Sequence, residues 1–356
     1  METHDITLVA AARPNLMKTA PLERALKAIQ PDLSIRKIYT GCENDPALEP
    51  SLWDDLSTRP CDACLGISEK SSLQILSQVL KAMDKELSLH PCQMLVTVDE
   101  STASVAAAIA AKKRGAHLVH LCAGVRSEDL SMSLEVNREL IDAISDTFFA
   151  SSFQGYQNLL RQGKDPSRVH YVGNILLDNI RILREKAARP SCIKDGSRFI
   201  LLTLNRRDLL EKEGFRDGLM KALDALPDDV SAVMPAHGYV KERLDGLACG
   251  KLILTDPLPY PQMLWAMSEA IGTVTDSCNV ADECTFLSTP TILLGNWSEH
   301  PELLTQGSAR LANEDPERLK ALLDQVIQGG WEAGGLPQWW DGRSAERIAR
   351  ILLGKS

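Results

Sequence analysis

Short apolar segments alternate with segments of helical spacing along the whole sequence, and this alternation limits the possible folds more than any other feature. In the first half, runs rich in Val, Ile and Leu are typical of buried strands, and turns and amphipathic segments follow them. The predicted strands are residues 6–12, 35–39, 94–98, 118–121 and 147–150, and the predicted helices are 21–29, 72–83, 101–113 and 134–144. Strands that alternate with helices form a parallel sheet covered on both faces, so this half predicts a doubly wound α/β domain.

The second half of the sequence begins the same alternation again. Its predicted strands are residues 199–204, 230–234, 252–254, 270–273 and 291–294, and its predicted helices are 215–226, 260–267, 280–286, 316–328 and 345–353. A chain of 356 residues is too long for one ordinary core. We therefore expect two similar α/β domains, residues 1–172 and 173–340, that face each other across a cleft, with a terminal segment, 341–356.

Charge and apolar content exclude several classes of protein. The formal net charge of −9 argues against a general nucleic-acid binder. No apolar run approaches the roughly 20 residues of a membrane span, and the first residues lack the features of a signal peptide. Cys61 and Cys64 form one C-x-x-C pair without a second pair at zinc spacing, so reduced thiols are expected rather than a metal site or a disulfide. We expect a cytoplasmic protein that binds neither nucleic acid nor a membrane.

Polar residues follow the predicted strands, at the edge of the sheet where such folds bind their ligands. Arg13 and Lys18 stand at the turn from the first predicted strand into its helix. Cations beside the unpaired N–H groups of a helix N-terminus suit an anion such as a phosphate. Asp99 and Cys122 follow two further strands of the same half.

The segment TDSCNVADEC, residues 275–284, suggests a second anion site. Ser277 can cap the helix that follows, and the N–H groups behind it could hold a diphosphate. Glu283 lies about two turns further on, where a carboxylate could accept two ribose hydroxyls. The alternative is that Ser277 only caps the helix and that Glu283 is solvated.

Seven segments, in order from about residue 12 to about residue 311, resemble the signature motifs of one enzyme family. They are ARPNLMKTAPL, TGCEN, VHYVGNILLDNI, LLTLNRRD, DPLPYPQMLWAM, TDSCNVADE and SEHPELLTQGSARL. Each motif is weak alone, but together they cover nearly the whole chain in register. On these residues the chain resembles the non-hydrolysing UDP-N-acetylglucosamine 2-epimerases.

The resemblance implies the GT-B arrangement of two Rossmann-like domains, with a UDP-sugar in the cleft and a carboxy-terminal helix that crosses back to the first domain. It places Arg13 and Lys18 at the diphosphate, Ser277 and the following backbone at a phosphate, and Glu283 at the ribose. The family's reaction eliminates UDP to leave a 2-acetamidoglucal and then re-adds UDP with inverted configuration at carbon 2. No cofactor is implied, and a homodimer is the expected assembly.

The sequence departs from the family's pattern at positions that carry acid–base chemistry. Cys122 stands in place of a glutamate, Leu134 in place of the first glutamate of a P-E-E-x-N-R motif, and Asn205 in place of a histidine. An asparagine forms hydrogen bonds but cannot transfer a proton near neutral pH. Asp99 is the acid–base position that persists.

Other differences fall in motifs that bind the substrate. Cys278 and Asn279 replace two glycines where the backbone approaches a phosphate, and His300 replaces an arginine. The last glutamate and the arginine of P-E-E-x-N-R persist as Glu135 and Arg138.

Two residues could take over the lost proton transfer. Cys122 could do so if His120 or Arg126 lowered the pKa of its thiol. His237 follows a predicted strand and could face the cleft. Each also has an ordinary interpretation, Cys122 as a small buried side chain and His237 as a hydrogen-bonded turn residue.

We therefore expect a UDP-N-acetylglucosamine 2-epimerase-like isomerase that acts on a UDP-sugar or related nucleotide sugar without a metal. The alternatives are a protein that binds the nucleotide sugar without turnover and a GT-B glycosyltransferase-like enzyme of altered specificity. The candidate catalytic residues are Asp99, Cys122, Asn205 and His237. The candidate substrate-binding residues are Arg13, Lys18, Arg126, Arg138, Ser277, Cys278, Asn279, Glu283 and His300.

Overall fold

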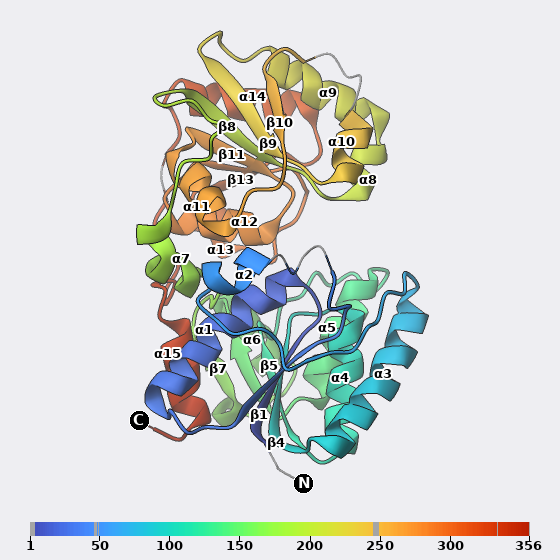
Figure 1. Ribbon diagram of the computed structural model, residues 1–356. Coiled ribbons are helices and arrows are strands. Elements are labelled where there is room, and N and C mark those ends of the chain that lie inside the picture. The colour runs from blue at the N-terminus through green and yellow to red at the C-terminus, as the bar shows by residue number, and fades with distance from the viewer. Residues whose placement is uncertain (1–3, 46–47, 49, 245–248, 333, 356) are drawn as a thin grey trace. The chain divides into compact units, whose positions relative to one another are not determined.

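The computed structural model describes residues 4–45, 48, 50–244, 249–332 and 334–355 (Figure 1). The chain divides into two compact units, one formed by residues 1–181 together with 338–356 and the other by residues 182–337. The sequence had suggested boundaries at 172/173 and 340/341. The structure places the first boundary later, between residues 181 and 182 inside a helix, and the end of the chain from residue 338 belongs to the first unit.

A seven-stranded parallel sheet forms the centre of the first unit, with the strand order β3-β2-β1-β4-β5-β6-β7. The strands are β1 (His4–Ala10), β2 (Ile35–Tyr39), β3 (Ala63–Cys64), β4 (Cys92–Val98), β5 (His117–Leu121), β6 (Thr147–Ala150) and β7 (Val169–Tyr171). The strand order reverses on either side of β1 and β4, so the carboxyl ends of these two strands meet at the switch point of the sheet, where doubly wound folds bind ligands.

Helices cover both faces of this sheet. They are α1 (Arg13–Ile29), α2 (Pro50–Asp55), α3 (Ser72–Leu89), α4 (Thr102–Lys113), α5 (Ser133–Ile144), α6 (Phe153–Arg161), α7 (Leu177–Leu183) and α15 (Ser344–Leu352), with a short 3-10 turn at Pro166–Arg168. A second 3-10 turn, Arg184–Lys186, belongs to the second unit. Helix α4 packs against both α3 and α5, and α15 packs against α1 (Figure 1). Leu8 and Val96 belong to the apolar cluster that includes α15, whereas their neighbours Val9 and Leu95 pack with α3 and α4. Adjacent strand residues thus fill the two opposite cores.

The second unit repeats the plan with a six-stranded parallel sheet, in the order β10-β9-β8-β11-β12-β13. The strands are β8 (Arg198–Thr203), β9 (Val230–Pro235), β10 (Leu252–Thr255), β11 (Gly272–Thr275), β12 (Thr291–Leu293) and β13 (Ala309–Leu311). The helices are α8 (Arg207–Glu211), α9 (Glu213–Asp224), α10 (Gly238–Leu244), α11 (Tyr260–Glu269), α12 (Cys278–Phe286), α13 (Glu302–Thr305) and α14 (Pro316–Ile327). One buried cluster joins β8 and β9 to α9 and α14. The predicted α/β class with two parallel sheets is confirmed.

The start of the first helix differs from the prediction. We expected it near Pro21, because proline normally disrupts a helix interior, but α1 already begins at Arg13 and carries Pro21 inside it. Pro14 suits the first turn, where the missing N–H removes no helical hydrogen bond. Lys18 therefore lies in the second turn of α1, inside the helix, as its place in the sequence indicated.

Three short strands, β3, β7 and β13, escaped prediction because two or three residues carry too little periodicity. Strand β11 begins two residues later than predicted, at Gly272. Within the described part of the chain, no helix combines the length and the apolarity that crossing a bilayer requires.

Candidate functional site

Two residues at the carboxyl edge of the first sheet adopt an unusual backbone conformation. Asp99 follows β4 with φ +53°, and Cys122 follows β5 with φ +62°. A left-handed conformation is uncommon for residues other than glycine, and it concentrates at functional sites because the surrounding structure must impose it. The two neighbouring strand ends are therefore a candidate site.

The carboxylate of Asp99 is held by two residues of α1. Lys18 Nζ lies 2.6 Å from Oδ1, and Asn15 Nδ2 donates to Oδ2 at 2.8 Å. The Asn15 amide has one possible orientation, because its Oδ1 already accepts hydrogen bonds from the N–H groups of Ala11 and Ala12 at 2.9 and 3.0 Å. Both oxygens of Asp99 are thus fixed by the helix that follows β1. The sequence had placed Lys18 at a diphosphate; the structure places its ammonium group against Asp99.

Arg13, the other cation of this segment, opens α1 and is half-buried. Its Nε is buried and has no hydrogen-bond partner among the described residues. A guanidinium group in this state can still bind an anion, as the sequence predicted.

The condition under which Cys122 could transfer protons is not met. Burial raises the pKa of its thiol well above the usual value; Lys18 opposes this shift, and Asp99 adds to it. His120 and Arg126, either of which would have had to lower that pKa, both contact Asp142 instead. His120 Nδ1 and Arg126 Nη2 lie 2.6 Å from its two carboxylate oxygens. Cys122 is therefore a neutral thiol near pH 7.

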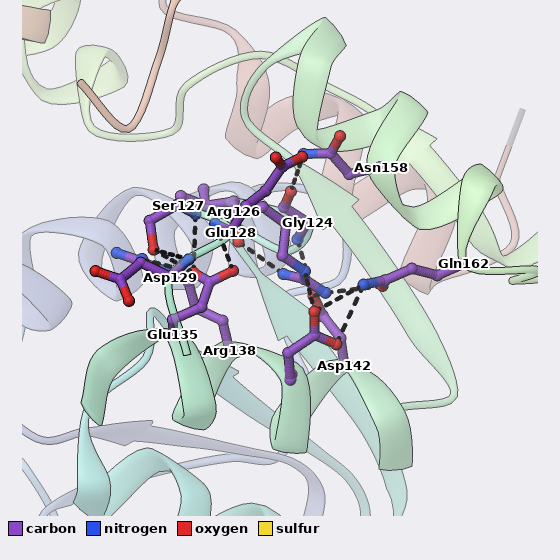
Figure 2. Close-up of polar contacts among 12 residues, drawn as sticks. Gly124, Arg126, Ser127, Glu128, Asp129, Glu135, Arg138, Asp142, Asn158 and Gln162 are labelled. Carbon is purple, nitrogen blue, oxygen red and sulfur yellow. Dashed lines mark hydrogen bonds and ion pairs between the residues drawn. The ribbon is translucent and has the colours of Figure 1, made fainter. Parts of the chain in front are cut away.

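A polar network on α5 and α6 fixes the loop that follows Cys122 (Figure 2). Asp142 accepts hydrogen bonds from the Gly124 N–H and from Arg126, and Arg126 also donates to Gln162 at 2.8 Å. Asn158 of α6 donates to the Gly124 carbonyl at 2.9 Å. The guanidinium group of Arg126 thus fixes the position of this loop.

Glu135 has a structural task in the same network (Figure 2). One of its oxygens accepts from the N–H of Ser127 at 2.9 Å and the other from the N–H of Glu128 at 3.2 Å. Arg138 Nη1 lies 3.1 Å away. Burial alone would raise the pKa of Glu135, but the hydrogen bonds from Ser127 and Arg138 lower it below the usual value. Leu134, in the position of the family's first glutamate, is 44% exposed.

The sequence assigned no catalytic or binding role to Glu100, which directly follows Asp99. Its Oε1 lies 3.0 Å from Arg138 Nη2, and its carbonyl accepts from Asn137 Nδ2 at 2.9 Å. The signal was visible in the sequence, because two acidic residues in succession end the strand.

The second unit presents a helix N-terminus after β11. Ser277 caps α12, its Oγ accepting from the Val280 N–H at 3.4 Å. Cys278 and Asn279 form the first turn and are half-buried. Glu283 is buried and accepts a hydrogen bond from the Tyr260 hydroxyl at 2.6 Å, so the alternative that it is solvated is wrong.

A histidine paired with a carboxylate lies next to the same helix. His300 is buried, and its Nδ1 is 2.9 Å from Oδ1 of Asp282 on α12. Burial alone would lower the pKa of His300, but the carboxylate of Asp282 raises it overall. His300 thus gains positive charge at the position where the family has an arginine.

The other two catalytic candidates, Asn205 and His237, are exposed. The backbone N–H of Asn205 donates a hydrogen bond to Asp276 Oδ2 at 2.6 Å. This contact fixes the backbone of Asn205 and not its side-chain amide. His237 precedes α10, which begins at Gly238, and its carbonyl accepts a hydrogen bond from the Lys241 N–H at 3.1 Å. Within the described ranges, no three His, Cys, Asp or Glu side chains are grouped so that they could hold a metal ion.

Two parallel Rossmann-like sheets with charged groups at their carboxyl edges define a GT-B type α/β protein. The family model of UDP-N-acetylglucosamine 2-epimerase matches residues 24–353. The chain belongs to this family.

Relatives of the chain cover it almost completely. The UDP-N-acetylglucosamine 2-epimerase of Methanocaldococcus jannaschii is 27% identical over 368 residues, 98% of each chain. The UDP-2,3-diacetamido-2,3-dideoxy-D-glucuronate 2-epimerase of Pseudomonas aeruginosa is 24% identical over 355 residues, 98% of this chain and 99% of that protein. The crystal structure of the UDP-GlcNAc 2-epimerase from Neisseria meningitidis bound to UDP-GlcNAc has the same fold, with a TM-score of 0.89 at 21% identity over 99% of this chain and 100% of that one.

Proposed function

We propose that the protein is an isomerase that inverts carbon 2 of a UDP-linked 2-acetamido sugar by elimination and re-addition of UDP. The observation that carries this proposal is the carboxylate of Asp99, fixed by Lys18 and Asn15 at the switch point of the first sheet in a chain of this family. Of the family's acid–base positions, it is the one that persists in this sequence. The two named relatives act on different UDP-linked acetamido sugars, so the exact sugar is to be found by assay.

The reaction requires proton transfer at carbon 2. A base takes the carbon-2 proton, the C–H electron pair forms the C1=C2 bond, and the C1–O pair leaves with UDP. In the return step a UDP oxygen bonds to carbon 1, and carbon 2 receives a proton on its opposite face. Asp99 is the proposed acid–base group for one of these proton transfers.

Each unit by itself contains groups that suit part of a UDP-sugar. Arg13 has a half-buried guanidinium group whose Nε lacks a hydrogen-bond partner among the described residues, and the N-terminus of α12 beside Ser277 offers backbone N–H groups to a phosphate. His300 adds positive charge next to α12. Glu283 could accept ribose hydroxyls, its orientation set by the hydroxyl of Tyr260.

A second candidate function is binding of the nucleotide sugar without turnover. It is favoured by the neutral thiol of Cys122 and by the apolar Leu134, because neither can replace a glutamate in proton transfer. Loss of one general acid–base group typically costs roughly 10² to 10⁴ in rate.

Product analysis separates these functions. The protein is incubated with UDP-N-acetylglucosamine and, separately, with the diacetamido-glucuronate analogue, and the carbon-2 epimer and free UDP are quantified by chromatography. An epimer that disappears in Asp99→Asn but persists in Asp84→Asn, a change in an exposed ion pair of the same unit, supports the isomerase. Thermal protection by UDP without either product supports the binding protein, and UDP release only with an acceptor sugar supports a transferase. Absence of product and of protection contradicts the proposal.

We also propose that the protein is a homodimer. Met132, Val136 and Leu140 recur at every fourth position along α5 and are 38%, 40% and 47% exposed. Leu73 on α3, which lies on the same face of the sheet, is 78% exposed. A second copy of the chain would bury this apolar face. Light scattering should give twice the chain mass, and Val136→Glu should give the monomer; a monomeric wild type contradicts this proposal.

A further inference from the structure

The proposed reaction needs two acid–base groups on opposite faces of carbon 2, and the sequence retains one of the family's groups. Cys122 is a neutral thiol and Leu134 has no proton to transfer, so neither supplies the second group. The structure does contain another carboxylate at this edge of the sheet, that of Glu100.

Three residues of α5 determine the position of Glu100. Asn137 holds its backbone carbonyl at 2.9 Å, and Arg138 holds its carboxylate at 3.0 Å. Glu135 in turn contacts Arg138 at 3.1 Å. The residues of the P-E-E-x-N-R motif that persist in this chain thus converge on Glu100, whose side chain is only 17% exposed.

Asp99 and Glu100 turn towards opposite neighbours of β4. Strand β4 lies between β1 and β5. The carboxylate of Asp99 contacts α1, the helix that follows β1, whereas the carboxylate of Glu100 contacts α5, the helix that follows β5. The two carboxylates therefore lie on the two sides of the end of β4, and groups that act on the two faces of one substrate carbon must likewise approach it from two sides.

The charge of Glu100 also reaches the position of the lost glutamate. It is among the groups that raise the pKa of the Cys122 thiol, together with Asp99. Glu100 thus lies close enough to interact electrostatically with the residue that stands where the family has a carboxylate.

We propose that Glu100 is the second acid–base group of the reaction, paired with Asp99. This inference rests on the proposed isomerase function. One carboxylate takes the carbon-2 proton as the C–H electron pair forms the C1=C2 bond and the C1–O pair leaves with UDP. The other, carrying a proton, gives it to the opposite face of carbon 2 as a UDP oxygen bonds to carbon 1. The two groups recover their starting protonation by exchange with water.

The test is Glu100→Gln in the full-length protein. Glutamine keeps an oxygen for Arg138 but cannot transfer a proton. We expect kcat to fall by roughly 10² to 10⁴ with KM changed by less than about threefold. The matched control is Glu86→Gln, because Glu86 forms an ion pair with Arg36 at 2.6 Å with 13% of its side chain exposed, remote from this edge. Its kcat should match that of the wild type.

A second variant distinguishes proton transfer from a structural role. Glu100→Ala should be inactive and should regain part of its kcat when formate, a small carboxylate, is added; formate should have no effect on Glu86→Ala. Rescue cannot arise from lost packing alone.

The outcomes separate the two proposals. If the wild type gives no epimer, the isomerase function fails and this inference fails with it. If the wild type is active and Glu100→Gln keeps its kcat, or loses affinity alone, Glu100 is not an acid–base group although the isomerase function stands. If Glu100→Gln does not fold, absence of formate rescue in Glu100→Ala overturns the inference in the same way.

Discussion

Lys18 of α1 and Asp99 at the end of β4 form an ion pair with 2.6 Å between Nζ and Oδ1. Lys18 is 5% exposed, so its ammonium group has little access to water other than through this site. Asn15 fixes the second oxygen of the same carboxylate, which leaves Asp99 with one orientation despite its left-handed backbone. The α1 segment that the sequence presented as an anion site therefore also positions the proposed catalytic carboxylate.

Replacing one partner of this pair should destabilise the first unit. Lys18→Met leaves Asp99 without its cation in a poorly hydrated site, and we expect the free energy of unfolding to fall by about 3 kcal/mol. Lys112→Met removes a more exposed pair with Asp146 and should cost less than about 1 kcal/mol. Urea denaturation of both variants measures the difference. Equal losses would show that the buried pair has no special role.

The turn after Cys122 should tolerate no side chain at Gly124. Gly124 has φ +83°, and a Cβ there would lie 2.2 Å from the carbonyl oxygen of Gly155, a backbone atom that cannot move away cheaply. Gly115 has a similar φ of +78° but open space around its Cα. Gly115→Ala therefore measures backbone strain alone, about 1 to 2 kcal/mol, and Gly124→Ala should cost clearly more. A thermal melt of each variant tests this, and equal shifts would refute the predicted clash.

Stability should depend on pH through Asp178 of α7. Its carboxylate accepts the N–H groups of Ser344 and Ala345 at the start of α15, at 3.1 and 2.8 Å. Burial raises the pKa of Asp178 to about 7, although these hydrogen bonds oppose the shift. Because the folded pKa exceeds the unfolded one, the folded chain binds the proton more tightly between pH 4 and pH 7. This stabilisation is complete below about pH 4 and is lost as the pH rises to about 7.

Asp178→Asn isolates this effect, because the amide oxygen still accepts hydrogen bonds but does not titrate. Between pH 5 and pH 8, the free energy of unfolding should decrease less in the variant than in the wild type. Identical pH dependence in the two proteins would show that Asp178 has an ordinary pKa in the folded state.

The thiol of Cys122 should react slowly with iodoacetamide. Only the thiolate is alkylated, and burial raises the pKa of this thiol well above its ordinary value. Peptide mapping after alkylation at pH 8 measures each cysteine separately, with Cys192, which is half-buried like Cys122, as the internal reference. If Cys122 were labelled faster than Cys192, Cys122 would again be a candidate acid–base residue.

The sequence predicted the α/β class, the two parallel sheets and the family, because those depend on periodicity and on motifs spread along the chain. It could not predict that α1 begins at Arg13, since Pro21 looked like a helix boundary and its tolerance depends on the surrounding packing. It could not predict the partners of charged groups either. His120 and Arg126 flank Cys122 in sequence, yet both contact Asp142, which comes from the next helix. Glu100 became a candidate only when Asn137 and Arg138 were found to converge on it.

The fate of the hydrogen on carbon 2 tests most directly that Asp99 and Glu100 move protons at that carbon. The wild type, Asp99→Asn and Glu100→Gln are each incubated with UDP-N-acetylglucosamine in deuterium oxide, and the mass of the recovered sugar nucleotide is followed with time. The wild type should introduce one deuterium at carbon 2, and each variant should do so at least about 100-fold more slowly. Deuterium entry at the wild-type rate in either variant would contradict the role of that carboxylate.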